Sequence, residues 1–326
     1  MSGPSLRSAG EGALLRRVAE RFRPNGSVLL GIGDDGAVVR PGASRGLPGS
    51  DVIAVADAMV EGVHFDRRWC PADAVGWKLV TCNVSDIAAM GGLPEWALLT
   101  CGFPGDLPLA WAEDLLDGVA RACAAFDLAV VGGDITGSPG PIVLSLSAFG
   151  IPGERVLTRS AASLDQGLYV TGPLGASALG LRALRSGAAD PPPVAVKAHL
   201  YPAPRVVEGR RLAACHAVGA CMDLSDGLGV DAARMAAASG VGLEVDAALL
   251  PLGEELSGLP REEALELALF GGEDYELLFT CSGTPPVPAV RVGRVVARPG
   301  LHVLLDGAPW SRGRPFDHFA PQPEGQ

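Results

Sequence analysis

A carboxylate beside glycine or another small residue recurs along this sequence, and this recurrence is the strongest constraint on how the chain can fold. Asp86 is the first example, because it interrupts an apolar run of helical period that ends in Gly91 and Gly92. A capping or solvent-facing aspartate would explain it in isolation. The same pattern, a carboxylate beside a small residue, follows apolar, strand-like runs in five further segments: residues 31–36, 55–57, 131–134, 222–227 and 271–274. So many acidic segments in one chain predict that they meet at one site.

Convergence of these carboxylates would create strong repulsion. Two unit charges about 5 Å apart repel by roughly 3 kcal/mol at an effective dielectric constant near 20. Divalent cations relieve such repulsion. Oxygen ligands without a thiolate or imidazole cluster favour magnesium or calcium over zinc, and phosphate oxygens usually complete a magnesium site that has few carboxylates. The pattern therefore predicts Mg²⁺ ions bound together with a phosphate-bearing ligand.

Composition narrows the possible classes of protein. A length of 326 residues allows two domains, and a formal charge of -11 argues against a nucleic-acid-binding surface. An anionic substrate would need metal ions and arginines to hold it. The seven cysteines are scattered without a Cys-x-x-Cys pair, which is typical of free thiols in a reducing compartment. With neither a signal peptide nor a membrane-spanning run evident, we expect a soluble, cytoplasmic protein that binds neither nucleic acid nor membrane.

Hydrophobic periodicity predicts an α/β or α+β layered architecture with a boundary near residues 150–153. The expected domains are residues 1–150 and 151–326. Helices are expected over residues 11–22, 71–90, 108–126, 175–185 and 204–218, with another beginning at residues 225–226 and the three prolines at 191–193 in a loop. Strands are expected over residues 27–30, 51–56, 95–101, 128–131, 141–149 and 221–223. Residues 155–159 and 167–171 open the second half, and further strands or helices are expected over residues 243–245, 261–270, 276–280 and 290–296.

Common catalytic motifs are absent from the sequence. It contains no phosphate-binding loop of the Gly-x-x-x-x-Gly-Lys-Ser/Thr type, no dinucleotide-binding glycine motif and no kinase catalytic-loop pattern. It also lacks a Gly-x-Ser-x-Gly elbow and a His-Glu-x-x-His helix. Phosphoryl transfer by metal positioning is the economical interpretation, since that reaction depends on charge neutralisation and alignment more than on a covalent side chain.

Six motifs occur in order along the chain, with their spacing intact: Gly-Ile-Gly-Asp-Asp (31–35), Asn-Val-Ser-Asp-Ile-Ala-Ala-Met-Gly-Gly (83–92), Gly-Gly-Asp (132–134), Leu-Thr-Arg-Ser (157–160), Asp-Leu-Ser-Asp-Gly-Leu (223–228) and Gly-Gly-Glu-Asp-Tyr-Glu-Leu (271–277). Together they resemble the thiamine-monophosphate kinase family, one of a larger group of ATP-using enzymes related to aminoimidazole ribonucleotide synthetase. The resemblance implies ATP-dependent phosphorylation of thiamine monophosphate to thiamine diphosphate, with ADP as the second product. It also implies a homodimer.

The same resemblance implies a two-domain fold. An N-terminal α/β domain, residues 1–150, would bind ATP and Mg²⁺ and pair its sheet with that of a second subunit. A C-terminal α/β domain, residues 151–326, would close over the ligands. Transfer would be direct and in line, with no covalent catalytic side chain.

Matched position by position, the family pattern assigns the site residues. The implied Mg²⁺ ligands are Asp35, Asp57, Asp86, Asp134, Asp223 and Asp226. The implied ATP contacts are Gly133, Asp134, Arg159 and Ser225, and the implied thiamine monophosphate contacts are His64, Glu273 and Phe316. The sequence departs from the pattern in two places. Val55 and Ala56 replace a frequent Ser-Thr pair, so only their main-chain oxygens could bind metal, and Phe316 replaces a frequent tyrosine or tryptophan.

Several alternatives remain at this stage. His64 could be a loop histidine satisfied by its own chain instead of an anion contact. A selenophosphate synthetase would carry a reactive cysteine and lysine near its N-terminus, and nothing before Cys70 fits; a hydrogenase-maturation relative is expected to end in cysteine, which this sequence does not. From another class, the chain could be a nucleotide or calcium sensor that keeps the acidic segments without turnover.

Overall fold

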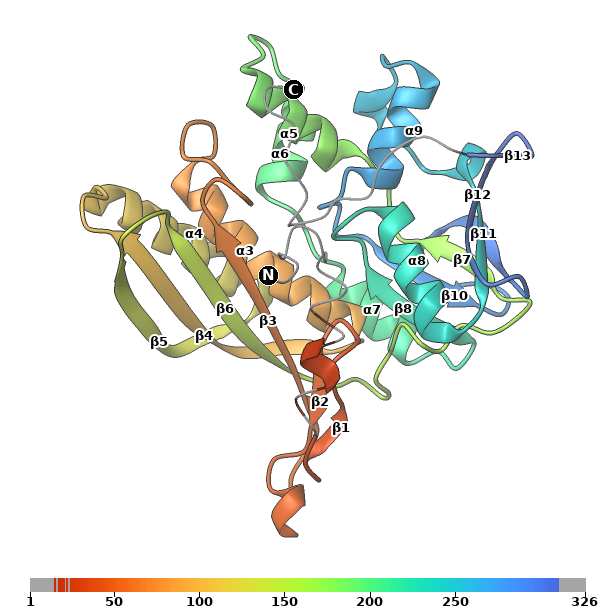
Figure 1. The fold of residues 1–326 in the computed structure, drawn as a ribbon, viewed down its shortest axis with the longest axis horizontal. Helices are drawn as coiled ribbons and strands as arrows, with labels where there is room; N and C mark the ends of the chain where they lie inside the picture. Colours follow the sequence, from red (N-terminus) through yellow and green to blue (C-terminus); the bar gives the residue numbers. More distant parts are fainter. Residues whose placement is uncertain (1–14, 16, 21, 23, 311–326) are drawn as a thin grey trace, which may run out of the picture.

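The structure is a computed structural model that describes residues 15, 17–20, 22 and 24–310. The first half of the chain builds a six-stranded sheet in the order β1-β2-β3-β6-β4-β5 (Figure 1). Strands β4 and β5 are parallel, and the other neighbours are antiparallel. The strands are β1 (Val28–Leu30), β2 (Ala37–Val39), β3 (Val52–Val60), β4 (Leu93–Pro104), β5 (Ala129–Ser138) and β6 (Val143–Ile151).

Two helices, α3 (Ala72–Ala89) and α4 (Leu109–Phe126), cover one face of this sheet (Figure 1). Helix α3 is buried on nearly all sides, as expected of a helix whose sequence is apolar around most of its circumference. The two helices approach closely at Gly76 and Gly118. A Cβ atom on Gly118 would lie 2.0 Å from the carbonyl oxygen of Asp73, so only glycine allows this approach.

The opposite face of the sheet carries exposed apolar side chains. Leu98 on β4 and Val143 on β6 are 42% and 40% exposed there, and Val131 and Ile135 on the edge strand β5 are 63% and 71% exposed. Strand β5 forms the sheet edge and is exposed along nearly its whole length. An open edge beside an apolar face is a surface that sheet proteins usually pair or cover.

The second half of the chain builds a seven-stranded sheet in the order β13-β12-β9-β11-β7-β10-β8. Strands β12 and β9 are parallel, and the other neighbours are antiparallel. The strands are β7 (Gly167–Val170), β8 (Val218–Asp223), β9 (Gly242–Asp246), β10 (Leu277–Cys281), β11 (Val290–Val296), β12 (Gly300–Leu305) and β13 (Ala308–Pro309).

Both faces of the second sheet are packed. On one face Met222 and Leu278 join a core with helices α8 and α9, and on the other Phe279 joins Leu212 and Ala89, from α7 and the end of α3. Helix α3 therefore contacts both sheets. The helices of this half are α5 (Ala176–Ser186), α6 (Pro193–Leu200), α7 (Val206–Ala213), α8 (Leu228–Ser239) and α9 (Arg261–Phe270), with short 3-10 helices η1 (Ala43–Arg45), η2 (Ala247–Leu249) and η3 (Glu254–Leu256).

The structure confirms the layered α/β architecture, and most expected elements are present. The helix expected over residues 11–22 lies largely outside the described residues. The helix expected over residues 204–218 is shorter in the structure, where only Val206–Ala213, α7, is helical within that range. The prediction of a loop over residues 191–193 is wrong at the last residue, because Pro193 is the first residue of α6. Proline is well suited to the first turn of a helix, where its missing N–H has no partner to lose.

The expected position of the carboxylates after strands also needs correction. Asp57 lies inside β3 and Asp134 inside β5, whereas Asp86 lies inside a helix, α3, as expected. The segments around Asp35, Asp226 and Glu273 lie in connections next to a strand. All seven cysteines are free of disulfides, as expected. In the described part of the chain, no helix is both long and apolar enough to cross a membrane.

The close contact between α3 and α4 generates the first prediction. Gly118→Ala places a methyl group against the backbone of α3, so we expect it to destabilise the fold by about 1–3 kcal/mol, measured by urea unfolding. Gly105→Ala is the matched control, because a Cβ there meets nothing within 4 Å. Its effect should stay within about 0.5 kcal/mol. Equal stability of the two variants would contradict this packing.

Candidate active site

A cavity of about 740 Å³ lies where the two halves of the chain meet. Its wall is formed by the β1–β2 connection, strand β3, helix α3, the β8–α8 connection and the α9–β10 connection. Its polar lining includes Asp34, Asp35, Asp57, His64, Lys78, Asp86, Arg159, His199, Asp223, Ser225, Asp226, Arg234 and Glu273. The structure therefore brings together predicted residues that lie far apart in the sequence.

Three carboxylates form the centre of this site. One oxygen each from Asp35, Asp86 and Asp223 lies within 4.8 Å of the others. Burial raises the pKa of Asp57, and its interaction with Asp86 partly opposes the increase. Burial, then the neighbouring carboxylates Asp223, Asp57 and Asp35, raise the pKa of Asp86 well above its usual value. The pKa of Asp223 rises to about 6 through burial, although Ser85 donates a hydrogen bond to it at 2.6 Å.

The donor set fits a hard divalent cation. All three ligating groups are carboxylates, and Oδ2 of Asp35 is buried without a hydrogen-bond partner in the described part of the chain. A buried carboxylate oxygen is normally paired or bound to a cation, because its desolvation is costly. Oxygen ligands of this kind favour Mg²⁺ or Ca²⁺. The geometry thus supports a cation site at Asp35, Asp86 and Asp223, with Asp57 beside it.

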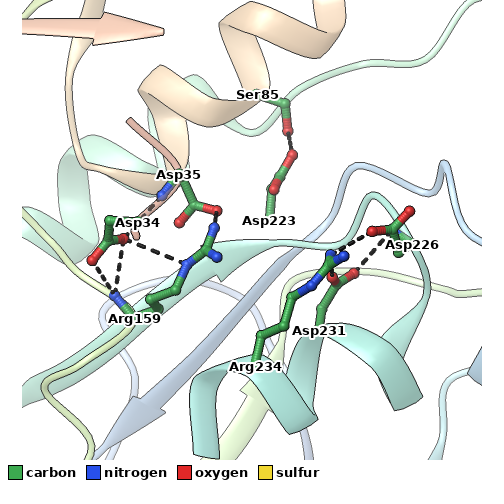
Figure 2. Close-up of polar contacts among 8 residues, drawn as sticks. All are labelled: Asp34, Asp35, Ser85, Arg159, Asp223, Asp226, Asp231 and Arg234. Atoms are coloured by element: carbon green, nitrogen blue, oxygen red, sulfur yellow. Dashed lines mark hydrogen bonds and ion pairs between the residues drawn. The ribbon is translucent and has the colours of Figure 1, made fainter. Parts of the chain in front are cut away.

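Arg159 closes the side of the cluster formed by the β1–β2 connection. Its main-chain N–H donates to both carboxylate oxygens of Asp34 at 3.2 Å, and its guanidinium donates to Asp35 (Figure 2). This arrangement fixes both aspartates relative to the second half of the chain. Burial raises the pKa of Asp34, and the two hydrogen bonds from Arg159 and Asp35 partly oppose the increase.

A second basic group lies beside Asp226. Arg234, on α8, donates to Asp226 and, at 2.9 Å, to the buried carboxylate of Asp231 (Figure 2). The backbone N–H of Asp226 donates to Asp231 at 3.0 Å, and burial raises the pKa of Asp231 to about 7. Sequence reasoning missed Arg234, Asp231 and Ser85. The helical spacing of Asp231 and Arg234, three residues apart just after the acidic segment, could have indicated the first two.

The other end of the cavity carries Glu273, which the family pattern predicted. Lys78 donates to its Oε2 at 3.0 Å, and Nδ1 of His199 lies 3.1 Å from the same oxygen. Burial alone would raise the pKa of Glu273, but the charge of Lys78 and the hydrogen bond from His199 lower it to about 2. The carboxylate is therefore ionised. Lys78 and His199 were not predicted as site residues.

His64 also lines the cavity. Its Nδ1 accepts the backbone N–H of Val60 at 3.0 Å, which fixes the ring and leaves its proton on Nε2. The local hydrogen bond agrees with a histidine satisfied by its own loop. The place of the ring in the cavity wall agrees with contact to a ligand as well. Phe316, the third predicted substrate contact, lies outside the described residues.

Gly133 and Asp134 are not brought to the cluster within one chain. Register pairs Asp57 with Leu146, Leu146 with Leu99, and Leu99 with Gly133. Asp57 is therefore three strand spacings, roughly 14 Å, from the row of Gly133. Successive side chains of a strand point to opposite faces, so Asp134 faces away from the side on which Asp57 meets α3.

Gly133 has a packing role in its own sheet. A Cβ atom at this position would lie 1.7 Å from the carbonyl oxygen of Leu99 on β4. The parallel pairing of β4 and β5 therefore requires glycine there. This requirement is independent of any contact with ATP, so the assignment of Gly133 to ATP stays a prediction.

Comparison with known proteins places this geometry in a class. Models of the AIR synthase related protein family match twice: the N-terminal domain over residues 33–152 and the C-terminal domain over residues 165–306. The chain thus has the two-domain fold of AIR synthase related proteins. Escherichia coli HypE shares this fold at 18% identity and a TM-score of 0.66, with 93% of this chain and 96% of that one covered.

Closer relatives identify the family within this class. Thiamine-monophosphate kinase from Escherichia coli K12 is 36% identical, over 96% of this chain and 99% of that protein. The enzyme of the same name from Aquifex aeolicus is 38% identical, over 85% and 89%. A solved structure of AaThiL complexed with AMPPCP and TMP has 34% identity and a TM-score of 0.85, with 98% and 100% covered. The chain belongs to the thiamine-monophosphate kinase family, which confirms the resemblance found in its motifs.

Repulsion within the carboxylate cluster generates a prediction about stability and pH. The folded-state pKa of Asp223, about 6, lies above its ordinary value of 3.8, so folding favours the protonated carboxyl group. The contribution of Asp223 to the free energy of unfolding is therefore fully present below about pH 4 and is lost as the pH rises through 6. Asp223→Asn should therefore raise the free energy of unfolding by about 2 kcal/mol at pH 7 in EDTA, and by less at pH 5.

Chemical denaturation at the two pH values measures this difference. Asp117→Asn on the exposed face of α4 is the control for loss of one carboxylate, and it should change stability little at either pH. A variant at Asp223 that is less stable than wild type at pH 7 in EDTA would contradict the proposed repulsion.

Proposed function

We propose that this chain transfers a phosphoryl group from ATP to thiamine monophosphate, yielding thiamine diphosphate and ADP. Family membership supports the proposal, as does the similarity to AaThiL, whose structure was solved with AMPPCP and TMP. The observation that carries it is the cavity itself. It places a carboxylate cluster suited to metal and phosphate at one end and an ionised glutamate, suited to a cationic ring, at the other.

Several Mg²⁺ ions are the proposed cofactor. Asp35, Asp57, Asp86, Asp223 and Asp226 line one region of the cavity and offer oxygen ligands only. Bound magnesium would neutralise phosphate charge and align donor and acceptor. The main-chain oxygens of Val55 and Ala56 are further possible ligands, in place of the hydroxyl groups that relatives often carry there.

Different residues of the chain are assigned to the two ligands. We assign Arg159 and Ser225 to the phosphates of ATP, because both line the cavity beside the carboxylates. His64 and Glu273 are assigned to thiamine monophosphate, and Phe316 is a further predicted contact. A thiazolium ring carries a positive charge, which the ionised Glu273 would attract.

Direct in-line transfer is the proposed mechanism. A phosphate monoester is mostly dianionic at neutral pH, so the acceptor needs no general base. A phosphoenzyme is disfavoured, because burial raises the pKa of the Cys82 thiol well above its usual value and keeps it protonated.

A homodimer joined through residues 1–150 is part of the proposal, with residues 151–326 closing over the ligands of the same chain. The exposed edge strand β5 and the apolar face beside it support pairing with a second copy. Such pairing would explain why Asp134 is remote from the cluster of its own chain. We propose that Asp134 and Gly133 act in the site of the second copy.

The activity is tested by release of ADP with and without thiamine monophosphate. We expect release to depend on thiamine monophosphate and on Mg²⁺, with free thiamine a poorer acceptor. A nucleotide or calcium sensor would bind its ligand without this release. ADP release at the same rate with and without thiamine monophosphate, or faster release with free thiamine, would overturn the proposal.

The role of Asp86 gives a second test. Asp86→Asn preserves shape but removes the central carboxylate, so we expect turnover to fall by at least about 10³-fold. The fold should persist, and MgCl₂ should raise the melting temperature of the wild type more than that of the variant. Asp117→Asn should keep wild-type turnover and wild-type stabilisation by MgCl₂. Normal turnover by Asp86→Asn would exclude the shared metal site.

Placement of Asp134 in the site of the second copy is tested by mixing two inactive variants, Asp86→Asn and Asp134→Asn. In a hybrid dimer, one site would carry both substitutions and the other neither. Equal mixing with subunit exchange should therefore restore about a quarter of wild-type activity. If Asp134 served its own chain, both sites of the hybrid would be defective and the mixture would stay inactive.

A further inference from the structure

Lys78 is a buried cation in the wall of the cavity, at the end opposite the carboxylate cluster. It lies on α3 eight residues before Asp86, which corresponds to about 12 Å along the helix. Only 2% of the residue is exposed. Its Nζ lies 3.0 Å from Oε2 of Glu273 and 3.2 Å from Nε2 of His199. Helix α3, helix α6 and the α9–β10 connection therefore meet at this ammonium group.

Glu273 has a backbone conformation that its own residue type does not favour. Its φ of 57° lies in the left-handed region, as does the φ of 70° at Gly272. The backbone N–H of Glu273 donates to the carbonyl oxygen of Ser225 at 2.7 Å. The same short segment thus touches the loop assigned to ATP through its backbone and the other end of the cavity through its side chain.

The contacts of the carboxylate are one-sided. Lys78 and His199 both contact Oε2, and in the part of the chain that the structure describes Oε1 accepts no hydrogen bond. His199 is itself fixed, since its Nδ1 lies 3.2 Å from Oγ of Ser177 and its ring packs 6.2 Å from that of Trp69. One oxygen is therefore anchored, and the other is available to a ligand in the cavity.

We propose that Lys78 is a positioning residue for the acceptor site, which acts by anchoring Glu273 so that the free carboxylate oxygen faces thiamine monophosphate. The inference rests on the proposed function. A purely structural role explains the geometry poorly, because a buried ion pair stabilises a fold no better than well-packed apolar side chains do. A lysine in the cavity wall is better explained by what its partner does in the cavity.

Lys78→Met tests this role, since methionine fills similar space without charge. We expect the KM for thiamine monophosphate to rise at least about tenfold, while kcat and the KM for ATP change less than about threefold, because the lost interaction binds ground state and transition state alike. The melting temperature should fall, because the buried carboxylate of Glu273 loses its cation, so the constants are measured at a temperature where the variant is folded. Lys197→Met, at the other lysine of the sequence and exposed on α6, is the matched control and should leave all three constants unchanged.

A double-mutant cycle shows whether Lys78 acts through Glu273. Glu273→Gln removes the charge, so adding Lys78→Met to that variant should raise the KM little further. Independent roles would instead multiply the two effects.

The pH dependence gives a readout that a structural role would not change. With Lys78 present, Glu273 is ionised throughout the working range, since its pKa is about 2. Without it, burial raises that pKa, so the KM of Lys78→Met should fall as the pH rises. Among the titratable neighbours, His199 has a lowered pKa, Cys82 and Tyr275 have pKa values raised well above their usual ones, and Asp274 has a pKa of about 7. Asp274 titrates in every variant, so subtracting the profile of Glu273→Gln isolates Glu273.

Three outcomes would overturn the inference: a wild-type KM in Lys78→Met, multiplicative effects in the cycle, or the same pH profile in Lys78→Met and Glu273→Gln. If Lys78→Met does not fold, Lys78→Gln is measured in its place, and failure of both to fold would assign Lys78 a structural role. Wild-type enzyme that releases no ADP in response to thiamine monophosphate would instead refute the proposed function, and the inference with it. Activity of the wild type therefore separates the two failures.

Discussion

Repulsion among the buried carboxylates of Asp35, Asp86 and Asp223 is the constraint on which the rest of this structure depends. The three groups come from the β1–β2 connection, helix α3 and the end of β8, so their repulsion acts to separate the two halves of the chain. Contacts elsewhere must oppose it. Trp77 donates to the carbonyl oxygen of Pro202 at 2.9 Å, and Tyr201 donates to Asp73 at 2.9 Å. These bonds join α3 to the second half close to the start of the helix.

Helix α3 explains how one chain can serve two kinds of ligand. Lys78, Cys82 and Asp86 recur at a spacing of four residues, so they share the helix face that lines the cavity. The face is cationic at one end and anionic at the other. Because α3 is buried between the two sheets, its polar groups stay fixed relative to both halves. A rigid helix thereby sets the distance between the metal and acceptor ends of the cavity.

The sequence allowed most of the secondary structure and most carboxylates of the site to be predicted, because periodicity and short motifs are local properties. It did not show that Lys78 and His199 meet across 121 residues, since that contact depends on how α6 docks against α3. It also misplaced Asp57 and Asp134 after strands. An aspartate inside a strand resembles one in a turn when small residues flank it, and only the strand register separates the two cases.

The segment of Gly132, Gly133 and Asp134 illustrates how register changes the meaning of a motif. The family pattern attaches a ligand role to it, whereas the structure attaches a packing role to Gly133, whose missing side chain lets β5 lie against β4. The two roles are compatible, because an edge strand forms backbone hydrogen bonds with a neighbour along one edge and leaves its other edge open. Strand β5 pairs with β4 along one edge within the chain. Asp134 lies on the face away from α3, so a ligand role for it requires a second surface to bring a cavity to that face.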